Sequence, residues 1–127
     1  MEMTTDRAPK TVKAGDHVLC MLNREYPGTM HPARVLSRKG RTVTVGYITG
    51  YTRTMGPRVR IDTFTWRANR KCWGGAGDGL PRKIDHILWF PDAEVASSCY
   101  MESDQDFEMI QEVAKKHPTR GDYIGSL

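Results

Sequence analysis

Basic and aromatic side chains alternate through the middle of the chain, a combination that can bind nucleic acid. Cations hold the phosphate backbone, and exposed rings stack on bases. The basic candidates for phosphate contact are Arg34, Arg38, Lys39, Arg41, Arg53, Arg58, Arg60, Arg67, Arg70 and Lys71. The aromatic candidates for stacking are Tyr26, Tyr47, Tyr51, Phe64 and Trp73. The alternative is a solvated basic surface above a core that contains Tyr47, Phe64 and Trp66.

Charge is segregated along the sequence. Residues 34–84 contain twelve basic and two acidic residues, a net charge of +10, whereas residues 85–127 contain three basic and nine acidic residues, a net charge of −6. Such asymmetry indicates either a basic surface that meets an anionic partner or attraction between the two segments within the fold.

The residue spacing gives less support to metal binding or to enzymatic catalysis. Cys20, Cys72 and Cys99 lack the paired spacing of zinc ligands, so we expect no metal and no cofactor. An active site built from Asp85, His86 and Cys99 is conceivable, but no nucleophile motif surrounds these residues. We therefore expect a non-enzymatic protein.

The composition places the chain among small globular domains. Its 127 residues suit one hydrophobic core, and no apolar run reaches the roughly 18–20 residues that cross a bilayer. An odd number of unpaired cysteines is typical of a reducing compartment, so we expect an intracellular protein, cytoplasmic or nuclear, without a membrane partner.

Apolar residues recur with a period of two in five segments, which predicts five strands. The strands are expected at 14–22, 31–39, 41–49, 58–66 and 84–90, and Val43, Val45 and Tyr47 share one face of the third. The turn at Gly40 predicts a hairpin. The glycine-rich segment 67–82 is expected to be a flexible insertion, and 50–57 a loop.

One helix is predicted after the strands, over residues 104–117. Ser103 offers an N-cap, and Phe107, Ile110 and Val113 recur at helical spacing. We expect residues 1–13 to form a disordered lead and 14–118 to form a single domain of strands and helix. Residues 119–127 are expected to form a tail that packs only through Tyr123 and Ile124.

The segment GDHVLCMLNREYPGTMHPARVLSRKGRTVTVGYITG resembles the opening of a Tudor or Agenet-type barrel. The resemblance covers about residues 14–66 and depends on the Gly15–Asp16 turn, the Tyr26–Pro27 loop and the Pro32–Val35 strand entry. It implies a mainly β fold, a small Tudor-like (SH3-like) barrel of five strands with one C-terminal α-helix. It also implies either a reader of methylated peptides, with Tyr26, Tyr47, Tyr51, Phe64 and Asp62 around the methylated cation, or an adaptor in chromatin and nucleic-acid complexes.

The leading hypothesis is a binding module that contacts nucleic acid, or a chromatin-like complex that contains it, through the basic barrel surface. The alternatives are a methylated-peptide reader and a protein-interaction adaptor or inhibitor. The adaptor would dock on its partner through the acidic helix or an edge strand. One form of this hypothesis is a protein of a virus or a mobile element that docks on a host protein.

Overall fold

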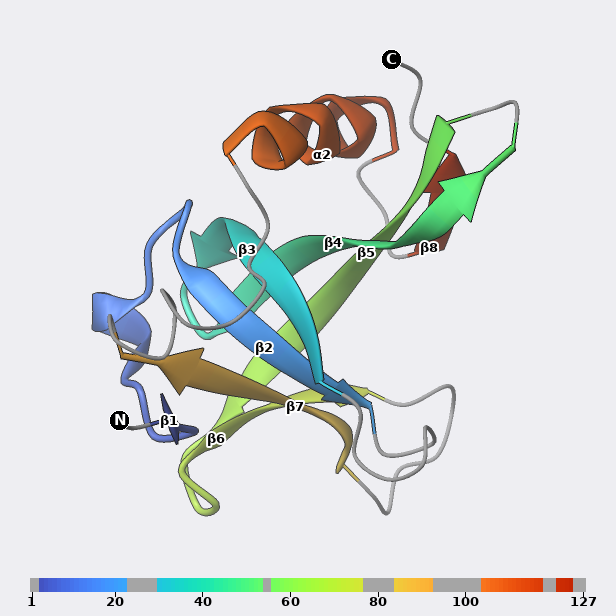
Figure 1. Cartoon of the computed structure of the whole chain (residues 1–127). Helices are drawn as coiled ribbons and strands as arrows, with labels where there is room; N and C mark the ends of the chain where they lie inside the picture. The colour runs from blue at the N-terminus through green and yellow to red at the C-terminus, as the bar shows by residue number, and fades with distance from the viewer. Residues whose placement is uncertain are drawn as a thin grey trace.

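The computed structural model describes residues 3–22, 30–53, 56–76, 84–92, 104–117 and 121–124. Its centre is a closed barrel of six antiparallel strands, each paired with its neighbours in sequence. The last strand returns to pair with the first, which closes the barrel (Figure 1). The strands are β2 (His17–Leu22), β3 (Met30–Lys39), β4 (Thr42–Thr52), β5 (Gly56–Arg67), β6 (Cys72–Ala76) and β7 (Ile84–Pro91). The predicted small mainly β barrel with one C-terminal helix is confirmed, with six strands in place of five.

The additional strand is β6, which lies inside the segment predicted to be a flexible insertion. That prediction is wrong for residues 72–76, because β6 pairs with β5 on one side and with β7 on the other. Trp73 is 0% exposed, and its burial offsets the low strand propensity of the glycines that follow it. The predicted loop at 50–57 is also shorter than expected, since β4 continues to Thr52 and β5 starts at Gly56.

The N-terminal segment is part of the fold. Strand β1 (Met3–Thr4) pairs with β7, and a short 3-10 helix, η1 (Pro9–Thr11), follows it. Val12 is 1% exposed in the barrel core, and the indole nitrogen of Trp73 donates a hydrogen bond to the Arg7 carbonyl at 2.8 Å. The predicted disordered lead is therefore wrong for residues 3–13, because Val12 gives this segment an apolar anchor.

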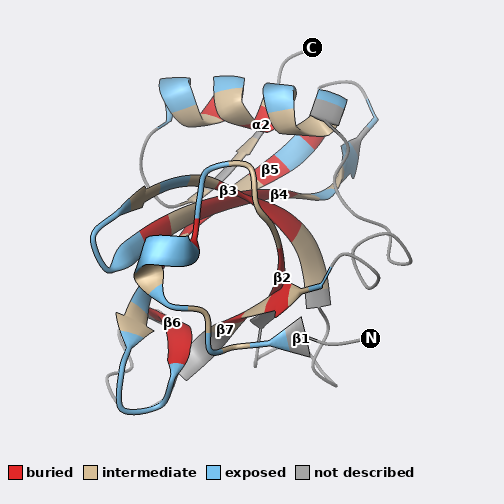
Figure 2. Ribbon diagram, turned by 90° about the vertical axis from the view of Figure 1, so that its left-hand side faces the viewer, coloured by how far each residue is buried: buried red, intermediate tan, exposed pale blue. Residues whose placement is uncertain are grey.

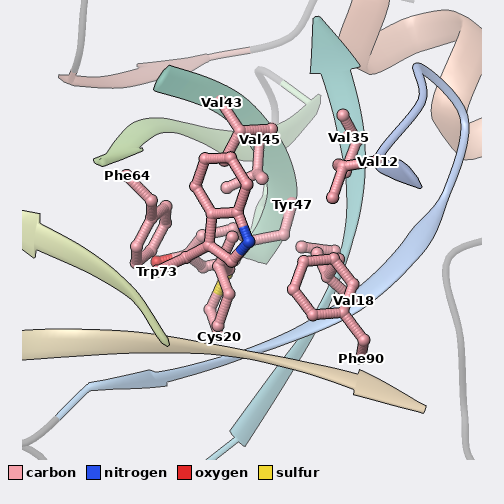
Figure 3. Close-up of a cluster of buried hydrophobic side chains, with 12 residues drawn as sticks. Val12, Val18, Cys20, Val35, Val43, Val45, Tyr47, Phe64, Trp73 and Phe90 are labelled. Carbon is pink, nitrogen blue, oxygen red and sulfur yellow. The ribbon is translucent and has the colours of Figure 1, made fainter. Parts of the chain in front are cut away.

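The barrel interior forms the main hydrophobic core. Figure 3 shows that side chains from several strands converge there around the Trp73 indole. The alternation predicted for β4 is observed, because Val43, Val45 and Tyr47 are all 0% exposed on the inward face. The buried members of this core are Val12, Val18, Cys20, Ala33, Val35, Val43, Val45, Tyr47, Phe64, Trp73, Leu88 and Phe90.

A second apolar cluster lies between the barrel and helix α2 (Asp104–Lys116), which matches the predicted helix. Ile110 and Val113 of α2 meet Val59 and Ile61 of β5, which point away from the barrel interior. Gly46 of β4 allows the close approach, because a Cβ atom at this position would overlap the Ile110 side chain. Figure 1 shows α2 lying across the outside of the barrel. No described helix is long and apolar enough to span a bilayer.

The segment after the helix adds a strand to the sheet. Strand β8 (Gly121–Ile124) pairs with residues Arg58–Ile61 of β5, beyond the part of β5 that pairs with β6. Tyr123 packs as expected, since its ring stacks on the His117 ring with centroids 4.3 Å apart. The predicted tail is nevertheless wrong for residues 121–124, because their backbone is paired.

Candidate functional site

The barrel brings two turns together that are distant in sequence. The β3–β4 turn centres on Gly40, which has a positive φ of 58°, and the β5–β6 turn includes Lys71, with a φ of 51°. The backbone amide of Trp66 donates to the Arg41 carbonyl at 2.8 Å, so the start of β4 lies beside the end of β5. Figure 2 looks toward this end of the barrel, where both turns are coloured as exposed.

Six of the ten predicted basic residues lie on these two turns, and we refer to them as the turn cluster. Arg38 is half-buried and donates to the carbonyls of Val12 at 3.1 Å and Gly40 at 3.0 Å, which holds it against the N-terminal segment. The other five are exposed. Neither sequence segment, 37–44 or 65–73, contains an acidic residue. The members of the turn cluster are Arg38, Lys39, Arg41, Arg67, Arg70 and Lys71.

The remaining predicted basic residues lie elsewhere. Arg34 is only 7% exposed, with its guanidinium 4.3 Å from the centre of the Phe107 ring and its Nε donating to the Gly15 carbonyl at 2.8 Å. The prediction that Arg34 contacts phosphate is therefore wrong, because its side chain is buried between α2 and the barrel.

The Arg60 guanidinium lies beside the carboxylate of Asp62 and is only partly exposed to solvent. Its Nε lies 3.5 Å from Oδ2 of Asp62, whose side chain is 2% exposed, so much of its charge is balanced within the fold. Arg53 and Arg58 are exposed on the half of the β4–β5 hairpin beside β8, across the molecule from the β5–β6 turn (Figure 1). Arg67 lies nine positions after Arg58 on the same strand, which corresponds to about 30 Å.

The structure changes the expected role of the aromatic residues. Tyr47, Phe64 and Trp73 are 0% exposed in the barrel interior (Figure 3), so their predicted stacking on bases is wrong. The reason is that strand alternation points all three rings inward. Tyr51 is 70% exposed on the part of the β4–β5 hairpin that holds Arg53, and Tyr26 lies outside the described residues.

The same burial removes the aromatic cage that the family resemblance implies. Tyr47 and Phe64 present no open ring face to solvent, and Asp62 is 1% exposed. A methylated cation needs access to several ring faces at once. Among the described residues, these side chains therefore do not form an open cage.

Three residues near the turn cluster were not among the predicted site residues, although Trp66 was considered as a core residue. Trp66 is half-buried against Trp73, with ring centroids 5.5 Å apart, and its backbone is bonded to Arg41. Lys10 and Lys13 are exposed on either side of the buried Val12, whose carbonyl accepts a hydrogen bond from the turn cluster. The sequence signal for this segment is Val12, an apolar residue between Lys10 and Lys13. It indicates a buried position, which the prediction of a disordered lead did not take into account.

Two buried thiols have perturbed acidity. Burial raises the pKa of the Cys20 thiol well above its usual range, and the Asp62 carboxylate raises it further, while the Arg60 guanidinium opposes the shift. Burial also raises the pKa of the Cys72 thiol, which the nearby guanidinium groups of Arg70 and Arg67 lower in part. A raised pKa keeps both thiols protonated at neutral pH, which disfavours nucleophilic chemistry.

Among the predicted catalytic candidates, Cys99 lies outside the described residues, and the structure describes Asp85 and His86 only as backbone of β7. In the part of the chain that the structure describes, no three His, Cys, Asp or Glu side chains gather closely enough to hold a metal ion. Comparison with protein-family models, curated proteins and solved structures found no match. The turn cluster, with five exposed cations on adjacent turns, can bind a polyanion by charge.

Proposed function

We propose that this protein is a non-enzymatic module that binds nucleic acid through phosphate contacts made by the turn cluster. The observation that carries the proposal is the meeting of five exposed cations on two turns that contain no acidic residue. Cations held this closely repel one another, and an anionic partner relieves that repulsion.

The arrangement of these cations suits a chain of phosphates better than a single anion. The β4 and β5 backbones are paired at Thr42 and Thr65, so the two turns start about 5 Å apart. Residues 68–71 then extend beyond this pair, which spreads the charges over several ångströms. Nucleic acid presents phosphates in continuous succession and can contact both turns at once.

The described surroundings favour electrostatic binding over base stacking. Trp66 is the aromatic residue whose backbone amide donates to the turn cluster, at Arg41, and its ring is half-buried against Trp73. Phosphate contacts carry little sequence information, whereas they depend strongly on salt. We therefore expect tolerant sequence preference and a steep salt dependence.

The test is a fluorescence-anisotropy titration of short DNA and RNA duplexes at several salt concentrations. Five phosphate contacts predict a slope of about −4.5 for the logarithm of affinity against the logarithm of salt. Between about 50 and 200 mM salt, this slope reduces affinity about 500-fold. Absence of binding at low salt would refute the proposal.

A matched pair of variants separates local binding from the effect of net charge. Arg41→Gln with Arg70→Gln removes one charge from each turn and is expected to lower the slope by about 1.8. The control, Arg53→Gln with Arg58→Gln, removes the same charge from exposed positions beside β8 and is expected to leave the slope nearly unchanged. Equal losses in the two variants would show that the turn cluster is not the binding surface.

A further inference from the structure

A groove opens beside the turn cluster, between α2 and the outer face of β3 and β4. Its volume is about 410 Å³, within the range of small-ligand pockets. Ser37 lies opposite Thr44, and Lys39 opposite Thr42, so these four outward side chains line one wall. Residues of α2, including Gln111 and Lys115, line the other wall.

The groove continues from the turn cluster through a shared residue. Lys39 belongs to the turn cluster and also lines the groove, so the two surfaces are contiguous at this residue. Lys115 adds a second ammonium group, and none of the described residues lining the groove carries a carboxylate. Glu112 does pair with Lys115 at 3.1 Å, but both side chains are more than half exposed and the pair is weak.

The lining chemistry suits a nucleotide base with its phosphate. The hydroxyl groups of Ser37, Thr42 and Thr44 and the amide of Gln111 can both donate and accept hydrogen bonds, as the edges of bases require. Leu36 and Ala114, which are both only half-buried, supply apolar surface for the base face. A base inside a duplex is stacked on both faces, so contact between its face and the groove requires an unstacked, unpaired base.

We infer that the groove holds one unpaired nucleotide of the strand whose phosphates the turn cluster binds. This inference depends on the proposed function and narrows its substrate class to nucleic acid with a single-stranded end or a bulge. The base is held by hydrogen bonds and apolar contact, and its phosphate by Lys39 and Lys115.

The test compares a blunt DNA duplex with the same duplex carrying a three-nucleotide overhang. The wild-type protein is expected to bind the overhang about tenfold more tightly, the effect of one or two hydrogen bonds to the base. A filled variant, Ser37→Ile with Gln111→Leu, is expected to lose this preference while keeping its affinity for the blunt duplex. A matched control, Thr49→Ile with Gln105→Leu, places similar side chains at exposed positions outside the groove and should keep the preference.

The possible failures are distinguishable. Equal affinity of the wild-type protein for the two duplexes, or a preference that survives in the filled variant, overturns the inference and leaves the proposed function intact if binding remains salt-dependent. Loss of the preference in the control variant also overturns it. Displacement of the overhang by micromolar free nucleoside monophosphate would show a site for free nucleotides instead, and circular dichroism checks that every variant is folded.

Discussion

Gly46 lies where α2 crosses β4. The substitution Gly46→Ala adds one methyl group there and tests how tightly α2 packs on the barrel. A Cβ atom would overlap the Cγ2 atom of Ile110 and would lie 3.2 Å from Leu36 Cδ1 and 3.4 Å from Ile61 Cδ1. Carbon atoms in contact normally lie about 3.5–4.0 Å apart. Gly46→Ala therefore forces α2 to move outward or Ile110 to leave its rotamer.

The magnitude follows from two opposing effects. Ile110 is 0% exposed, and a β-branched side chain in a helix has one strongly preferred χ1 rotamer, so it yields poorly. Overpacking of this kind costs about 1–3 kcal/mol, while replacement of a strand glycine by alanine returns about 0.5–1 kcal/mol. We expect Gly46→Ala to reduce the free energy of unfolding by about 1–2 kcal/mol.

A double-mutant cycle with Ile110→Ala isolates the contact. Ile110→Ala alone should cost about 2–5 kcal/mol, because it leaves a cavity under α2. In the Gly46→Ala background the overlap is removed and the new methyl group fills part of that cavity. The double variant should therefore be more stable than the sum of the single effects by about 1–3 kcal/mol.

Urea unfolding followed by circular dichroism measures all four proteins of the cycle. Gly50→Ala on the same strand is the control, because a Cβ atom there meets nothing within 4 Å, and we expect it to leave stability unchanged or slightly raised. Additivity of the two changes within about 0.5 kcal/mol would refute the close approach of α2 to Gly46.

Three further predictions concern the barrel interior. Val12→Ala should lower the free energy of unfolding by about 2 kcal/mol in urea unfolding, whereas no effect would show that Val12 does not pack in the barrel core. Trp73→Ala should cost about 3–5 kcal/mol by the same measurement, and a neutral result would contradict the place of β6 in the core. The Cys20 thiol has a pKa raised by burial, so the unfolded chain releases this proton first and the free energy of unfolding should fall as pH rises above about 8.5. In urea unfolding between about pH 7 and pH 10, the free energy of unfolding should fall less steeply with pH for Cys20→Ala than for the wild-type protein. Identical pH dependence in the two proteins would show that the Cys20 thiol is not buried in the folded state.

Local patterns in the sequence determined much of the secondary structure. The alternation of Val43, Val45 and Tyr47 predicted β4 and its buried face, and the spacing of Ile110 and Val113 predicted α2. Gly40 predicted the turn that joins β3 to β4, where its φ is positive. These features depend on neighbours only a few residues apart, which is why a single sequence can display them.

Closure of the barrel was decided by contacts between distant segments. The glycines after Trp73 are typical of a loop, but β6 is stabilised by pairing with both β5 and β7 and by the burial of Trp73. Val12 packs in the barrel core with residues of distant strands. The sequence shows an apolar residue at this position, but no local pattern shows which distant residues it packs against.

The sequence predicted one property of the candidate site, and the tertiary structure decided the others. The composition by itself established that residues 34–84 carry a large excess of positive charge. Only the tertiary structure distinguishes Arg34, buried under the Phe107 ring, from Arg41, exposed on a turn, because the two side chains have identical chemistry. Successive strands of the barrel run in opposite directions, so alternate turns lie at the same end, and this brings Arg41 beside the turn that holds Arg70 across an interval of 29 residues.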